Sequence, residues 1–182
     1  MTSQAFQAFE HAIQDAKELL NHFDSLNAQP LPPSTEVLKR ASLVMALAAL
    51  ETYIEDRITE AARTVSGGSA NGDRLAEFYI SSLQNDLKYF HTPSADRVRA
   101  IFEKFLEIDV TEGWHWNNYD PARARTELNR LAKKCGAIAH RSLRPRAGQP
   151  DAHAVTREDL RKHIRFISDL VAATDKYVAE KL

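Results

Sequence analysis

Apolar side chains recur every three or four positions along most of the chain, and this spacing predicts α-helices. Six stretches carry the pattern, at about residues 4–26, 35–65, 74–90, 95–107, 121–140 and 157–180. The strict alternation of apolar and polar positions that indicates a β-strand is missing between them. We therefore expect an all-α fold, a bundle of about six helices that residues 1–182 form as a single domain.

Proline and glycine mark the ends of the first two helices. Pro30, Pro32 and Pro33 end the first helix, because a proline ring supplies no N–H for a helical hydrogen bond. The glycine-rich stretch 66–73 ends the second helix, and it lacks the Gly-x-x-x-x-Gly-Lys pattern of a phosphate-binding loop. The second helix is the longest and most apolar, so we expect it to be the central strut of the bundle.

Acidic side chains gather in the middle of this second helix. Glu51 and Glu55 lie one turn apart, with Asp56 and Arg57 beside them. Paired carboxylates can work as general acid and base or bind a metal ion. On a solvated helix such groups are more often surface charge, and we favour that interpretation here.

The helix at 121–140 is the most informative part of the chain. Asp120 is a favourable N-cap, and Pro121 suits the first helical position, where a missing N–H costs no hydrogen bond. Five side chains then alternate at spacings of four and three, which places them on one core-facing stripe: Ala124, Leu128, Leu131, Cys135 and Ile138.

His140 projects about 160° away from that stripe. Lys133 shares its face, together with the small residues Gly136 and Ala137. Small side chains leave room for a second helix or a nucleic-acid backbone. The same pattern also fits a solvated helix end, and the sequence leaves both interpretations open.

Charge is balanced over the whole chain but not along this helix. The chain has 24 basic and 25 acidic residues, so its net charge of −1 gives no overall field for nucleic acid or membrane. Between Asp120 and Arg146 the acidic residues are only Asp120 and Glu127, whereas the basic residues are Arg123, Arg125, Arg130, Lys133, Lys134, Arg141, Arg144 and Arg146. This local patch suits an RNA phosphate backbone, and it also complements the dipole at a helix C-terminus.

Other features of the composition exclude several classes of protein. A single cysteine forms no intramolecular disulfide. Glu112 and His115 have a Glu-x-x-His spacing without a second such pair, so we expect no metal and no cofactor. Neither a secretory leader nor about 20 consecutive apolar residues is present, and we expect a cytoplasmic protein without membrane contact.

Aromatic residues gather in the irregular stretch 111–119, which contains Trp114, Trp116 and Tyr119. Such rings can stack on unpaired bases. Aromatic rings more often complete a core or a subunit interface, and we favour that interpretation.

The run from Leu128 to Arg141 resembles the signature helix of the HEPN superfamily, in particular of its RiboL-PSP-like branch, whose helix ends in Arg-Asn-x-Ile-Ala-His. Ile138-Ala139-His140 is the sharpest part of the match. The segments 48–56 and 108–114 also resemble that branch, so the likeness extends from residue 38 to about 143. It implies a HEPN-like bundle and a homodimer in which two signature helices meet across a twofold axis. The motif's arginine and histidine would then form a metal-independent RNA-cleaving site.

The chain departs from the family motif at the arginine. The motif places four to six residues between its arginine and its histidine, and counting back from His140 in this way gives Cys135, Lys134 and Lys133. Gly136 takes the place of the motif asparagine. Of the catalytic residues in the family motif, only the histidine, His140, is therefore present in this chain. Lys133 or Lys134 could place a positive charge near a phosphate, although lysine lacks the planar fork of arginine.

Supporting roles follow for residues around the signature helix. Arg130, Arg141, Arg144 and Arg146 are candidates for RNA binding. Glu51 is a candidate for orienting His140 by accepting its second ring proton.

Two functions remain open at this stage. The first is a metal-independent endoribonuclease of a defence or toxin–antitoxin system, with His140 as acid or base on a ribose 2′-OH. The second is a non-catalytic dimerisation module that binds RNA or a partner protein. The missing arginine favours the second, and the local basic patch is compatible with both.

Overall fold

The computed structural model describes residues 2–26, 35–67, 74–140 and 155–182. Within these ranges it contains six α-helices, which are α1 (Gln4–Ser25), α2 (Glu36–Val65), α3 (Arg74–Leu87), α4 (Ala95–Leu106), α5 (Pro121–His140) and α6 (Arg157–Lys181). A short 3-10 helix, η2 (Val110–Gly113), lies between α4 and α5. No strand occurs in the described ranges, and the predicted all-α fold of about six helices is confirmed.

The predicted helix starts rest on polar caps. Ser3 caps α1 by accepting a hydrogen bond from the Phe6 amide at 3.0 Å. Thr156 caps α6 in the same way through the Asp159 amide, also at 3.0 Å. A capping oxygen of this kind satisfies one of the amide donors that have no partner inside the helix.

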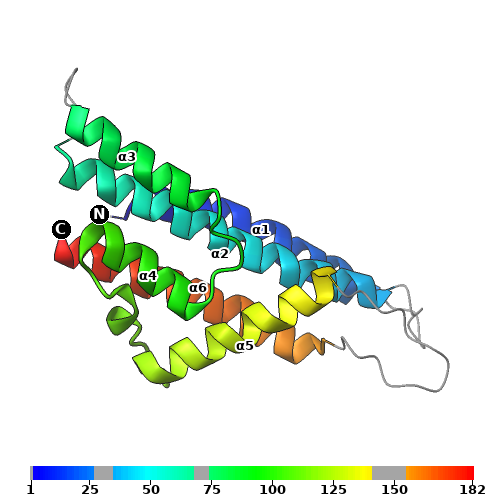
Figure 1. The fold of residues 1–182 in the computed structure, drawn as a ribbon. Coiled ribbons are helices and arrows are strands. Elements are labelled where there is room, and N and C mark those ends of the chain that lie inside the picture. The colour runs from blue at the N-terminus through cyan, green and yellow to red at the C-terminus, as the bar shows by residue number, and fades with distance from the viewer. Residues whose placement is uncertain (1, 27–34, 68–73, 141–154) are drawn as a thin grey trace.

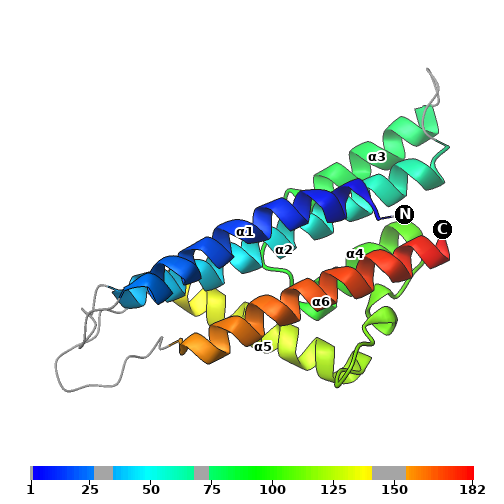
Figure 2. The same cartoon turned by 180° about the vertical axis from the view of Figure 1, so that it is seen from behind.

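The second helix is the central strut, as predicted. α2 contacts each of the other five described helices, and its pairing with α1 is the most extensive in the bundle. Small residues allow this close pairing, because Ala16 and Ala46 are fully buried and the Ser42 hydroxyl donates to the Ala16 carbonyl at 2.6 Å. Figures 1 and 2 show α1 and α2 side by side along the length of the molecule.

α6 forms a second layer with α4 and α5, and it runs antiparallel to α1 (Figure 2). The segment before α5 is packed into this layer. Trp114 is fully buried and donates from its indole nitrogen to the Thr174 hydroxyl at 2.9 Å. Trp116 and Tyr119 stack on each other and lie against Phe166. The aromatic residues of 111–119 therefore complete the core, as the favoured interpretation predicted.

A buried ion pair joins the two layers. Arg57 of α2 lies with its Nε 2.9 Å from Oδ1 of Asp175 in α6, and both side chains are almost completely buried. Ser3 also donates to Asp175 from both its backbone N–H and its hydroxyl. Arg57 is therefore part of the contact between the layers, because α6 covers that face of α2.

No helix in the described ranges is both long enough and apolar enough to cross a membrane.

Candidate functional site

The core-facing stripe of α5 is buried as expected. Its buried residues include Ala124, Leu128, Leu131, Cys135 and Ile138. Cys135 is 3% exposed, and its thiol donates to the Leu43 carbonyl of α2 at an Sγ to oxygen distance of 3.8 Å. Burial raises the pKa of this thiol to about 12, so the sulfur stays protonated and unreactive at neutral pH. The position that the resemblance aligns with the motif arginine thus faces the core.

The opposite side of α5 ends in an uncovered patch. His140 and Lys133 are exposed, and Gly136 and Ala137 are partly exposed between them. Within the described ranges the side chains of His140 and Lys133 make no hydrogen bond or ion pair. A Cβ built on Gly136 would meet nothing within 4 Å. We call the face formed by Lys133, Gly136, Ala137 and His140 the open face of α5.

The N-terminus of α4 limits the open face. Asn129 lies on the same side of α5, one turn before Lys133, and its Oδ1 accepts a hydrogen bond from the Ala95 amide at 2.8 Å. This contact caps α4 and covers α5 at that level. Beyond it α5 continues past α4 toward the start of α2, as Figure 1 shows. The open face is therefore the part of α5 that α4 does not reach.

The basic residues predicted to bind RNA differ in their surroundings. Arg130 forms a bidentate pair with Glu127 at 2.7 and 3.0 Å. A hydrogen bond from Arg130 lowers the pKa of Glu127, which keeps the pair ionised. Lys134 is partly exposed beside the open face. Arg141, Arg144 and Arg146 lie outside the described residues, and their RNA-binding role stays a prediction.

Glu51 is engaged away from His140. Its Oε2 accepts a hydrogen bond from the Thr92 amide at 3.1 Å, in the connection between α3 and α4. Thr92 has a φ of 66°, a left-handed conformation that is unfavourable for a β-branched residue. The described contacts give Glu51 a structural role in holding this turn and do not join it to His140.

Sequence reasoning missed a polar cluster between α5 and α6. His163 is 4% exposed, and its Nδ1 lies 3.7 Å from Oε1 of Glu127. Its Nε2 is buried without a hydrogen-bond partner in the described ranges. The helical spacing of α6 could have revealed that His163 is buried, because His163 lies one turn after Leu160 and beside Ile164 on the buried stripe of that helix. Burying a charged imidazole without a partner costs more free energy than burying a neutral one. Burial therefore favours the neutral form of His163.

This cluster predicts a loss of stability in mild acid. Burial and, next, the charge of Arg130 lower the pKa of His163 below its ordinary value of 6.5. The unfolded chain therefore binds more protons than the folded chain as the pH falls below 6.5, and the free energy of unfolding should fall with it. His163→Leu should make that dependence shallower in urea unfolding between pH 7.5 and about 5. The same substitution at exposed His11 should leave the dependence intact, and an unchanged slope in His163→Leu would contradict the assignment.

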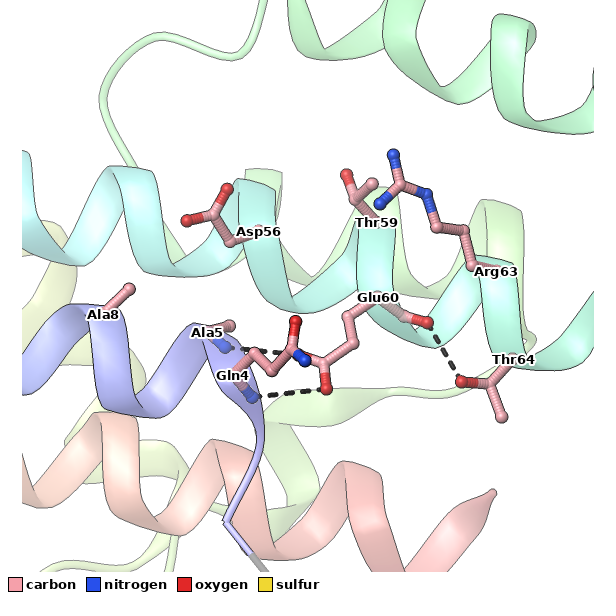
Figure 3. A pocket seen from close by; sticks show the side chains of 8 residues that line it. All are labelled: Gln4, Ala5, Ala8, Asp56, Thr59, Glu60, Arg63 and Thr64. Carbon is pink, nitrogen blue, oxygen red and sulfur yellow. Dashed lines mark hydrogen bonds between the residues drawn. The ribbon is translucent and has the colours of Figure 1, made fainter. Parts of the chain in front are cut away.

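A cavity of about 610 Å³ lies at the other end of the bundle, between the start of α1 and the end of α2 (Figure 3). Glu60 occupies it from α2 and accepts hydrogen bonds from the Gln4 and Ala5 amides at 3.3 and 3.2 Å. The N-terminus of α1 is therefore already capped by a carboxylate, which leaves no free donors there for an anion. Across the described ranges, no group of three or more potential ligands could hold a metal ion.

The described residues form an all-helical bundle in which a buried aromatic segment precedes a helix that ends in buried Ile138 and exposed Ala139 and His140, and this arrangement is consistent with a HEPN-type domain. A model of the RiboL-PSP-HEPN family matches residues 10–180. The chain therefore belongs to the RiboL-PSP-HEPN family. Neither a search of curated proteins nor a search of solved structures gave a match.

Proposed function

We propose that the chain forms a homodimer through the open face of α5 and cleaves single-stranded RNA there without a metal ion. Its membership of the RiboL-PSP-HEPN family supports a HEPN-type, RNA-related role. The observation that carries the proposal is the uncovered patch itself. A titratable histidine and a lysine without a partner in the described ranges flank two small residues on one side of one helix.

The spacing on this face suits a twofold axis. The midpoint between Lys133 and His140 falls between Gly136 and Ala137. Two copies of α5 that cross antiparallel at this point can approach closely, because no side chain beyond a methyl group lies at the crossing. Lys133 of one copy then lies beside the partner's His140, whereas within one copy the two residues are about 10 Å apart along the helix.

Such a paired site can cleave RNA with two groups. His140 accepts the proton of a ribose 2′-OH, and the O2′ attacks the adjacent phosphorus. The bond to the 5′ oxygen breaks, and this leaving oxygen takes a proton from water. Lys133 of the other copy stabilises the negative charge on the phosphate oxygens, with Lys134 adding positive charge at the edge. The products are a 2′,3′-cyclic phosphate and a 5′-hydroxyl.

Removing either group should abolish most of the activity. We expect His140→Ala and Lys133→Ala each to slow cleavage of a single-stranded RNA in EDTA by about 10²-fold or more, with both variants still dimeric. Light scattering on the same samples records the oligomeric state, and product end groups identify the reaction. Purified wild-type dimer that leaves RNA intact would overturn the nuclease proposal.

Mixing the two variants tests the symmetry. In the antiparallel arrangement a mixed dimer keeps one intact site, made of Lys133 from one copy and His140 from the other. Random exchange should therefore restore about a quarter of the wild-type rate. No recovery would mean that both groups act from the same copy.

A second candidate function is a non-catalytic module, and the burial of Cys135 favours it, because the family's arginine position faces the core. This candidate predicts dimers that bind RNA in a salt-sensitive manner and never cleave it. Salt-insensitive binding of a protein would instead assign the open face to a protein partner. A role in defence or in a toxin–antitoxin system is part of the nuclease proposal, and it predicts that the wild type, but not His140→Ala, arrests growth when expressed.

A further inference from the structure

A second surface with RNA-binding chemistry lies between α1 and α6. These two helices run side by side and antiparallel on the face seen in Figure 2. A groove of about 480 Å³ separates their exposed sides. Its floor is apolar, formed by Leu20 and Ile164, which are both buried. The groove is a different surface from the open face of α5.

The walls of the groove are basic. Lys17 of α1 and Arg161 and Arg165 of α6 line it, and none of its lining residues is acidic. Lys17 and Arg165 make no ion pair within the described ranges, so their charges are available to a ligand. This concentration of positive charge is local, because the chain as a whole has a net charge of −1.

The positive charge of Arg161 is only partly neutralised by its ion-pair partner. Asp24 is its partner at 2.7 Å, but Asp24 also binds Arg157 at 2.6 Å. Burial alone would raise the pKa of Asp24, and the two guanidinium groups outweigh burial and lower it. One carboxylate is therefore shared by two arginines, and this end of the groove stays positive.

These features select one kind of ligand. Arg161 and Arg165 are one turn apart, about 6 Å along α6, which suits successive phosphates of a strand. No aromatic side chain lines the groove, so it offers charge for a backbone rather than stacking for bases. None of the exposed large hydrophobic residues of the described ranges lines it either, so it lacks the apolar groups that would insert into a membrane surface.

The groove extends to the end of the bundle that carries the nuclease candidate. Arg157 and Arg161 lie in the first turns of α6, and Figures 1 and 2 place this end of α6 at the same end of the bundle as the C-terminus of α5. A strand held along α1 and α6 would therefore reach the end of the bundle at which α5 ends in His140.

We propose that the groove between α1 and α6 binds the phosphate backbone of single-stranded RNA and holds it without regard to sequence beside the open face of α5. This inference rests on the proposed function, since it assigns a second contact surface for the same substrate. It predicts that binding depends on salt in proportion to the number of phosphates contacted.

The test measures RNA affinity by fluorescence anisotropy over a series of salt concentrations. A Lys17→Ala, Arg165→Ala double variant should flatten the plot of log affinity against log salt by about 1.4, because each phosphate contact to a single strand contributes about 0.7. The loss should be equal for uridine-rich and mixed-sequence strands. Lys176→Ala is the matched control, because Lys176 is on the same helix, 79% exposed, and outside the groove.

The outcomes separate this inference from the nuclease proposal. Wild-type protein that cleaves RNA while the double variant keeps the full salt slope overturns the groove alone. Binding that survives in His140→Ala without cleavage, and weakens in the double variant, supports both. Protein that binds no RNA overturns both. Equal affinity for polyglutamate or for anionic vesicles would make the groove a general anion surface and overturn its assignment to RNA.

Discussion

Replacing Cys135 with arginine should destabilise the bundle severely rather than rebuild the family motif. The side chain at this position is 3% exposed and packs against α2, so the guanidinium would be buried next to the Leu43 carbonyl without an anion. An unpaired buried charge of this kind costs about 3–5 kcal/mol, a large share of the 5–15 kcal/mol that stabilises a typical domain. Urea unfolding followed by circular dichroism measures the loss directly.

Two control variants distinguish the effect of the added arginine charge from the effect of changing position 135. Cys135→Ala removes the thiol without adding charge and should cost about 1 kcal/mol. Gly136→Arg places the same arginine on the open face, where an added Cβ meets nothing within 4 Å inside one copy, so that variant should stay folded but lose the close helix crossing of the proposed dimer. A folded Cys135→Arg protein with increased cleavage would contradict the described packing. It would require α5 to rotate, because positions 135 and 140 point about 140° apart on a helix.

Asp175→Ala should produce a comparable loss of stability at the other end of the bundle. Arg57 and Asp175 are 4% and 5% exposed, and their closest atoms are 2.9 Å apart. Without the carboxylate, Arg57 keeps a buried charge with no counterion, and Ser3 loses the acceptor that ties the start of α1 to α6. We expect the free energy of unfolding to fall by about 3–5 kcal/mol.

A double variant tests whether the loss comes from the orphaned charge. Arg57→Met with Asp175→Leu removes both charges and keeps similar volume, so it should be much more stable than Asp175→Ala. The exposed neighbour Lys176→Ala should change the free energy of unfolding by less than about 0.5 kcal/mol. A loss below about 1 kcal/mol in Asp175→Ala would show that water or another group replaces the carboxylate.

Local sequence determined the helices and the direction of each side chain on α5. The period of three to four residues set the helical ranges, and oxygen-bearing caps such as Ser3 and Thr156 set their starts. The same period placed Cys135 in the core and His140 on the opposite side, because a residue's direction on a helix depends only on its position along it. The family resemblance carried by Ile-Ala-His was likewise available from the sequence.

The tertiary structure decided which helices cover which faces and which charged groups meet. Arg57 and Asp175 pair across more than a hundred residues, and Glu51 is engaged by Thr92 rather than His140. The groove between α1 and α6 combines Lys17 with Arg165 in the same way. Helical spacing fixes directions within one helix, but contacts between helices depend on how all of the apolar stripes pack together. Sequence periodicity therefore identified the open face of α5, and only the packed bundle showed where that face is left uncovered.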